Sequence, residues 1–342
     1  MITFKPKQIT KKLLSALPER ARDVLEKRYG LGTDTNPFTL ESIGQTYGIT
    51  RERVRQIEAY GISSIQKSDI YGEFKTIFDE LYGLIDKLGG GFLAEEQLLD
   101  ALSTDASTRN HIYFLLMVGD PFFRAKENNS YMHRWYTEKQ KADAVEKALR
   151  NVYQSLERDE LVSEEDILAR FREELIGIAD KHEEDVLKRW LLVSKDIARN
   201  PLGEWGHASS PNVKVKGIRD YAYLVVKRHG SPMHFREVAE MIQQLFDRKA
   251  HVATTHNELI KDKRFVLVGR GLYALSEWGY SAGVVKDVLR DILEKNGPLT
   301  REEIVDKVRK ERYVKDNTIL VNLQDTNLFK KLSNGAYTLV TE

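Results

Sequence analysis

The chain has 342 residues, of which 41% are hydrophobic and 31% charged, with a formal net charge of +1 and no cysteine. The lack of cysteine excludes disulfides and every thiolate metal or redox site. A chain of this length is too long for one hydrophobic core, so we expect several domains. No apolar run reaches the length of a membrane span and the first ten residues lack a signal-peptide core, which predicts a cytoplasmic protein with no membrane partner.

Charge is distributed unevenly along the sequence. Basic residues outnumber acidic ones by 12 to 8 over residues 1–70 and by 10 to 7 over residues 217–280. Acidic residues outnumber basic ones by 10 to 6 over residues 71–137 and by 17 to 14 over residues 138–216. Residues 281–342 carry 11 basic and 10 acidic side chains. Basic ends around an acidic middle indicate nucleic-acid contact at the ends and protein contact between them.

The first predicted elements are a helix that Pro18 opens and Gly30 closes, a loop over residues 32–38, and a helix-turn-helix. Thr39 and Thr50 are suited to cap the two helices of that motif. Gly44 keeps the first helix slim at the crossing, and Gly48 permits the sharp turn between the helices. The side chains expected to bury one face of each helix are Ile43, Tyr47, Ile49, Val54 and Ile57.

The second helix of the motif presents a polar outer face. It consists of Glu52, Arg55 and Gln56, flanked by Arg51 and Arg53. Arginine can grip guanine, glutamine can bracket adenine, and glutamate can accept from the amine of cytosine, so this face suits reading of the DNA major groove. A charged, solvated helix face with internal pairs is the alternative interpretation.

The stretch TLESIGQTYGITRERVRQIEA, with the preceding LPERARDVLEKRYGL, resembles region 4 of the sigma-70 family, over roughly Leu13 to Lys67. The resemblance implies recognition of a promoter −35 element in double-stranded DNA and action with the core of bacterial RNA polymerase. It also implies base contacts by some residues of the second helix and backbone contacts by others. The implied base readers are Arg51, Glu52, Arg55 and Gln56, and the implied backbone contacts are Thr50 and Arg53.

One departure from the family concerns the residues after Glu58, where basic side chains are usual. This chain has Tyr60, Gly61, Ser63 and Ser64 at those positions. Fewer phosphate contacts predict weaker binding by this module alone.

Beyond residue 70 a pattern recurs, in which an apolar residue precedes an acidic amphipathic helix. The aligned apolar residues are Leu93, Val162, Met233 and Leu299. Each copy continues to an apolar residue and, eight positions later, an aromatic one; the pairs are Phe123 with Tyr131, Ile197 with Trp205, Phe265 with Tyr273, and Phe329 with Tyr337. RFVLVGRGLYALS and LFKKLSNGAYTLV are typical of two strands around a tight turn. Three helices followed by a hairpin predict winged helices.

We therefore predict a mainly α fold of tandem helix-turn-helix and winged-helix modules with small β-hairpin wings. The expected modules are a helix-turn-helix, a winged helix, a divergent helical or winged-helix module with a linker, and two further winged helices, over residues 1–70, 71–137, 138–216, 217–280 and 281–342.

The fourth module, with SPMHFREVAEMI and HNELIKDKRFVLVGRGLYALSEWG, resembles the HARE-HTH domain, which also occurs in the delta subunit of bacterial RNA polymerase. The resemblance covers roughly Gly217 to Gly279 and implies contact with DNA or with polymerase. The helix before the wing is expected to carry Thr254, Thr255, Asn257 and Lys261. Candidate backbone contacts are Lys261, Lys263, Arg264 and Arg270. A solvated hairpin rim is the alternative.

The corresponding helices of two other modules differ in character. Residues 109–119 include the apolar run HIYFLLMVG, which predicts core packing or a partner surface. The last module offers polar and basic side chains suited to DNA, namely Lys315, Asn317, Thr318, Asn322, Lys330 and Lys331.

We find no pattern that indicates catalysis or a bound cofactor. The eight histidines lack metal-ligand spacing, and the glycine clusters lack the GK[ST] of a phosphate-binding loop. Acidic pairs near the helix starts are explained by the helix dipole. We expect no enzyme, no catalytic residue, no cofactor, no metal and no small-molecule substrate.

The leading hypothesis is a sequence-specific DNA-binding transcription factor, associated with the nucleoid, that acts with RNA polymerase. Only a dozen residues precede the sigma-like match, so we expect no −10 or DNA-melting region and favour a regulator over a complete initiation factor. The alternative is a winged-helix scaffold on polymerase or chromatin with unspecific DNA contact. A nucleic-acid-processing enzyme ranks third.

Overall fold

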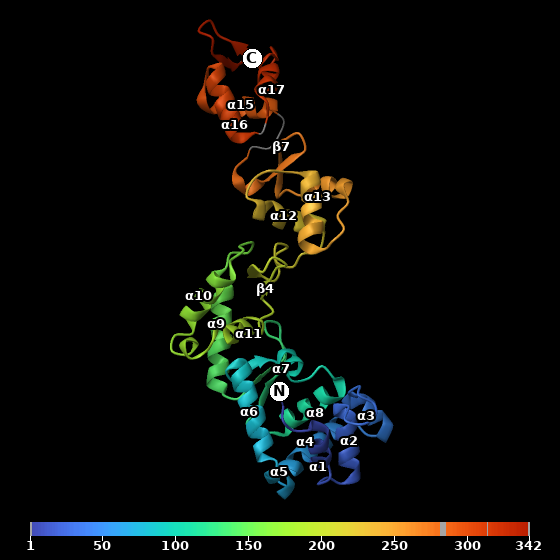
Figure 1. Cartoon of the computed structure of the whole chain (residues 1–342). Helices are drawn as coiled ribbons and strands as arrows, with labels where there is room; N and C mark the ends of the chain where they lie inside the picture. Colours follow the sequence, from blue (N-terminus) through green and yellow to red (C-terminus); the bar gives the residue numbers. More distant parts are fainter. Residues whose placement is uncertain (1, 281–284, 313, 341–342) are drawn as a thin grey trace. The chain divides into compact units, whose positions relative to one another are not determined.

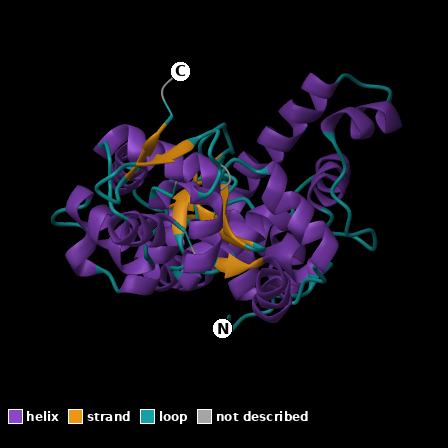
Figure 2. Cartoon of the chain, turned by 90° about the horizontal axis from the view of Figure 1, so that it is seen from above, coloured by secondary structure: helices purple, strands orange, loops and turns teal. Residues whose placement is uncertain are grey.

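A computed structural model describes residues 2–280, 285–312 and 314–340. The chain divides into two compact units, Met1–Arg199 with Gly203–Ser210 and Asn200–Leu202 with Pro211–Glu342, which we describe one at a time. Helices dominate both units, and the strands are short and antiparallel (Figure 2). The predicted mainly α fold is therefore confirmed. Across the described ranges we find no helix with the length and apolar character of a membrane span.

The first unit begins with the four helices of the sigma-like region. These are α1 (Pro6–Leu14), α2 (Glu19–Tyr29), α3 (Leu40–Tyr47) and α4 (Arg51–Gln66) (Figure 1). The second of them ends at Gly30 in the left-handed conformation, with φ of 60°. The predicted helix end is confirmed, since glycine adopts this conformation without the strain that a Cβ causes.

The next part of the unit is the first winged helix. It contains α5 (Asp69–Glu73), α6 (Lys75–Gly89), β1 (Phe92–Ala94), α7 (Glu95–Leu102), α8 (Ala106–Val118), β2 (Phe123–Ala125) and β3 (Arg134–Tyr136). The three strands form an antiparallel sheet in the order β1-β3-β2. The wing predicted from the sequence is thus present.

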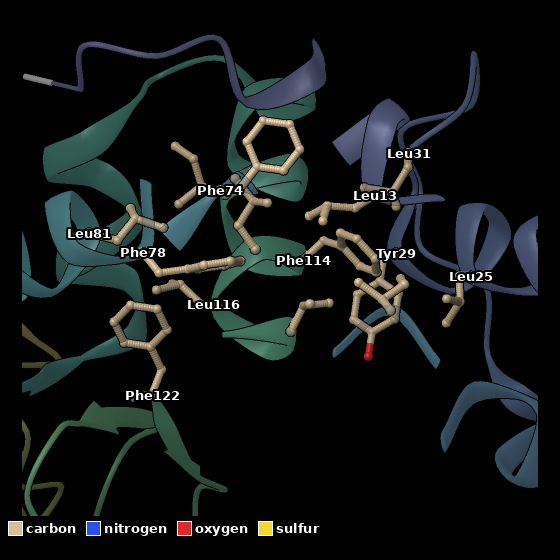
Figure 3. Close-up of a cluster of buried hydrophobic side chains, with 14 of the residues drawn as sticks. Leu13, Leu25, Tyr29, Leu31, Phe74, Phe78, Leu81, Phe114, Leu116 and Phe122 are labelled. Carbon is tan, nitrogen blue, oxygen red and sulfur yellow. The ribbon is translucent and has the colours of Figure 1, made fainter. Parts of the chain in front are cut away.

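Helix α8 packs the sigma-like helices against the first winged helix. Tyr29 of α2 meets Phe114 edge-on, with ring centroids 5.3 Å apart, and meets Tyr113 at 5.9 Å. In Figure 3, Tyr29 and Leu13 lie to one side of this helix and Phe78 lies to the other. These side chains belong to one continuous core, so the expectation that residues 109–119 are a core or partner surface is confirmed as core.

The sheet of the first winged helix separates this core from a second one. Leu93 of β1 and Trp135 of β3 join the first core, whereas Phe92 and Ala94 join the second. Alternate residues of a strand point to opposite faces, which explains the division. The second core is completed by α9 (Lys139–Ser155), α10 (Glu164–Glu174), η1 (Ala179–Lys181), α11 (Glu184–Leu191), β4 (Ile197–Arg199) and β5 (Trp205–His207).

The second unit holds two further winged helices. One comprises α12 (Ile218–His229), β6 (Met233–His234), α13 (Phe235–Phe246), α14 (Val252–Lys261), β7 (Phe265–Gly269), β8 (Leu272–Leu275) and η2 (Ser276–Trp278). The other comprises α15 (Val285–Asn296), α16 (Arg301–Glu311), α17 (Asp316–Leu323), β9 (Phe329–Lys331) and β10 (Tyr337–Leu339). Gly335, in the connection between β9 and β10, has a φ of 86°, a conformation that glycine adopts without strain.

One backbone pairing recurs in all four repeats. The aligned apolar residue faces an aromatic residue of the wing across antiparallel backbone, in the pairs Leu93 with Trp135, Val162 with Trp205, Met233 with Tyr273, and Leu299 with Tyr337. The sequence alignment placed these aromatics correctly in the last three copies.

In the first copy, the prediction that Phe123 and Tyr131 occupy the equivalent positions of the wing is wrong. Phe123 is 49% exposed, while its neighbour Phe122 is buried. Tyr131 bridges Ser194 outside the sheet, and Trp135 takes the expected place. The connection between β2 and β3 is longer than in the other wings, which moves the aromatic residue along the sequence.

We predict that Phe114→Ala lowers the free energy of unfolding of the first unit by about 3 to 5 kcal/mol, because it leaves a cavity between α2 and the first winged helix. Hydrogen exchange should then accelerate in α2 and α6 together. The control is Phe123→Ala, which removes an exposed ring and should cost less than about 1 kcal/mol. Faster exchange in only one of the two helices would contradict a shared core.

Candidate nucleic-acid interface

The helix-turn-helix is held in shape by two threonine caps and two glycines. Thr39 Oγ1 accepts from the backbone N–H of Ser42 at 3.1 Å, and Thr50 Oγ1 accepts from that of Arg53 at 3.2 Å. Gly48 has a φ of 63°, and a Cβ on Gly44 would lie 2.6 Å from the carbonyl oxygen of Ile49. The predicted roles of these four residues are confirmed, and both glycines are required by geometry.

A small core beneath the turn fixes the angle between the two helices. Ile43 of α3, Val54 of α4 and Val24 of α2 are completely buried and pack together. The partly buried side chains that surround them are Leu40, Tyr47, Ile49 and Ile57. The set predicted from the sequence is thus assembled as expected, and it leaves one face of α4 directed to solvent.

That outer face carries all the predicted base readers. Arg51, Glu52, Arg55 and Gln56 are exposed, as are the two predicted backbone contacts, Thr50 and Arg53. Arg55 donates to both carboxylate oxygens of Glu52, at 2.9 Å and 2.7 Å. Arg53 donates to the side-chain oxygen of Gln56 at 3.0 Å. The free protein therefore pairs these side chains with one another.

The pairing with Arg55 favours the charged form of Glu52 and leaves its carboxylate accessible to other partners. The hydrogen bond from Arg55 lowers the pKa of the Glu52 carboxyl below its ordinary value, and partial desolvation opposes this effect. Both side chains are about 60% exposed, so water screens their attraction. Such a pair exchanges readily with other hydrogen-bonding partners, and the edge of a base pair offers them.

Behind this face, Tyr29 and Glu58 anchor α4 to α2. The Tyr29 hydroxyl donates to the Glu58 carboxylate at 2.9 Å, and Arg28 lies 3.4 Å from the same carboxylate. Burial and the negative charge of Glu58 raise the pKa of Tyr29, so its hydroxyl keeps its proton. Sequence reasoning missed this pair, although its residues share helix faces with the predicted core.

Among the residues that depart from the family after Glu58, Gly61 lies at the contact between α4 and α2. A Cβ on this buried glycine would lie 2.9 Å from the Cδ1 atom of Leu25. A side chain at this position would therefore require the buried Leu25 to shift. Tyr60, beside it, is 58% exposed.

In the second unit, four residues were predicted to contact the DNA backbone. Lys261, Lys263 and Arg270 are exposed, and their contacts with DNA stay predictions. Arg264 is turned inward, 2.8 Å from the carboxylate of Asp220 and 2.6 Å from that of Asp262. A phosphate contact by Arg264 would have to break these ion pairs.

The prediction for one residue of α14 is wrong. Thr255 is completely buried, whereas Thr254 and Asn257 are exposed as expected. Position 255 lies on the side of α14 that also buries Leu259, one helical turn later. On the last winged helix, Lys315, Asn317, Thr318, Lys330 and Lys331 are exposed, and Asn322 is half-buried.

Within the described residues, no group of histidine, aspartate and glutamate side chains lies close enough together to hold a metal ion. The candidate functional site is the exposed face of α4, where five charged or amide side chains lie together. A capped, glycine-turned helix pair with arginine, glutamate and glutamine along its second helix defines a helix-turn-helix of the DNA-reading class.

Comparison with known proteins narrows this class. Residues 13–67 match the family described as Sigma-70, region 4. Over 55 residues the chain is 51% identical to the RNA polymerase sigma factor SigA of a Nostoc species, which is 16% of this chain and 14% of that protein. It is 52% identical over 54 residues to SigA1 of Synechococcus elongatus, covering 16% and 13%. The chain thus contains a sigma-70 region 4 domain and spans about a seventh of these relatives.

We predict that Arg264→Met destabilises its winged helix by about 3 kcal/mol, because it leaves the buried Asp220 carboxylate without its cation. Faster hydrogen exchange in α12 measures the loss. The neighbouring Lys263→Met removes the same charge from an exposed position and should change stability by less than about 0.5 kcal/mol. Equal effects of the two substitutions would refute a structural role for Arg264.

Proposed function

We propose that this protein is a sequence-specific transcription factor that reads a −35-like promoter element through α4 and acts with bacterial RNA polymerase. The observation that carries the proposal is the exposed row of Arg51, Glu52, Arg55 and Gln56 on a helix-turn-helix that matches sigma-70 region 4. Arg55 and Gln56 supply the donors and acceptors that distinguish guanine and adenine in the major groove.

Two features support sequence reading over unspecific attraction. The base-reading side chains stand on a regular helix whose angle is fixed by a buried core, and such rigid placement is what direct readout needs. They are also exposed, and the hydrogen bonds of Glu52, Arg55 and Gln56 join side chains of the same helix face, so a matching base pair can replace each partner. The role of polymerase rests on the relatives, whose names describe RNA polymerase sigma factors.

One observation favours a second function, a scaffold on polymerase. In the first winged helix, α8 stands where a winged helix usually places its recognition helix, and most of its apolar residues are buried. That helix cannot enter a major groove along its length without unfolding the core. The resemblance of residues 217–279 to HARE-HTH domains is compatible with either function.

We predict that selection from a random duplex library by the full-length protein enriches one hexamer of the −35 type. Arg55→Ala with Gln56→Ala should weaken binding to that hexamer roughly 5- to 150-fold per lost base contact, and leave unspecific binding nearly unchanged. The matched control is Gln8→Ala with Lys11→Ala, which removes an exposed amide and an exposed cation from α1.

Enrichment that survives the Arg55 and Gln56 substitutions would contradict base reading by α4. Equal weakening on all sequences would contradict it as well, because loss of a phosphate contact has no sequence preference.

For polymerase, we predict that purified bacterial core enzyme is retained by the immobilised full-length protein. Retention should persist in the Arg55 and Gln56 variant, since those side chains face DNA. Retention without any sequence preference in the library selection would favour the scaffold, and absence of retention would refute both forms of the polymerase proposal.

A further inference from the structure

A groove of about 780 Å³ runs between α4 and α8 in the first unit. The two helices are tied at their C-terminal ends, where Gln66 Nε2 donates to the carbonyl oxygen of Val118 at 2.9 Å. Ile62 and Met117 line the groove near this end. Its other end is lined by Arg51 and Arg55 of α4 and by the first turns of α8. One wall of the groove is therefore part of the proposed base-reading face.

The opposite wall gathers positive charge from a module that is acidic as a whole. Residues 71–137 contain ten acidic and six basic side chains. Three of the basic ones, Arg109, Arg124 and Lys126, line the groove, whereas none of the ten acidic ones does. Glu58 of α4 is the one acidic side chain in the lining, and it is engaged by Tyr29 and Arg28.

The three basic residues of this wall differ in exposure and in the ion pairs that they form. Arg124 is 17% exposed and is held by Glu95 and by the ring of Tyr113, so it shapes the wall. Arg109 is 31% exposed and pairs at 2.8 Å with Asp100, which is itself 64% exposed. Lys126 is exposed, and no ion pair engages its side chain among the described residues. Arg109 and Lys126 are therefore able to meet an external anion.

We propose that Lys126 and Arg109 contact the phosphate backbone of DNA whose major groove is occupied by α4. This inference rests on the proposed function. The major groove is about 12 Å wide, so the phosphates of one strand pass close beside a helix inserted in it. On the side of Arg51 and Arg55, those phosphates face the cationic wall of the first winged helix.

The uncharged end of α4 makes such contacts necessary for tight binding. From Ala59 to Gln66 this helix has no basic side chain, and Gly61 is fixed by packing against Leu25. Backbone contacts hold a reading helix in register and supply much of the affinity. In this protein the first winged helix supplies them, from a position fixed by the shared core.

The test measures binding of full-length protein to its selected duplex and to a scrambled duplex at several salt concentrations. Lys126→Ala with Arg109→Ala should weaken binding to both duplexes on the order of 10-fold and reduce the slope of log affinity against log salt by about two. The matched control, Lys75→Ala with Lys87→Ala, removes two exposed lysines of the same module that do not line the groove. It should leave affinity and slope unchanged.

Equal effects of the two double substitutions, or an unchanged slope in the groove variant, would overturn the inference. Thermal unfolding of both variants shows whether a weaker affinity reflects loss of structure, and ethylation interference then locates the phosphates lost with Lys126. If the selected hexamer remains dependent on Arg55 while the groove variant behaves as the control does, the proposed function stands and this inference fails. If the wild-type protein binds no duplex, both fail.

Discussion

Burial of α8 on two sides is the constraint on which the first unit depends. Tyr29 and Leu13 cover this helix from the sigma-like region, and Phe78 covers it from its own module. The apolar area of Phe114 and its neighbours can leave water only if both parts are present. The orientation of α4 follows from this packing, since Tyr29 also holds Glu58 and Gly61 rests on Leu25. The orientation of the surface that we propose to meet DNA is thus set by contacts on the opposite side of α4.

Local chemistry in the sequence was enough to predict the helix-turn-helix and most of its exposed face. Thr39, Gly48 and Thr50 act through their own backbone or through residues three positions away, so their roles can be read from spacing. The repeat also identified the wing aromatics Tyr273 and Tyr337, because short wings keep the offset constant; the structure shows that they face Met233 and Leu299.

Features set by tertiary contact were not accessible in the same way. The aromatic residue of the first wing was assigned to Tyr131 because the longer loop before β3 hides the register of Trp135. Arg264 was assigned to the surface because its partner Asp220 lies 44 positions away in sequence. The cationic wall opposite α4 was masked by the acidic composition of residues 71–137 as a whole. The net charge of a segment does not show on which face of the folded module its basic and acidic side chains lie.

The core shared by the sigma-like helices and the first winged helix has a consequence for how this domain can be transferred between proteins. Family resemblance ends at residue 67, yet a fragment cut there would uncover Leu13 and Tyr29 where α8 now lies. Apolar surface of that kind promotes association between copies. In this chain the structural unit is accordingly longer than the matched segment, and a chimera that carries residues 13–67 into another protein would have to carry α8 with it.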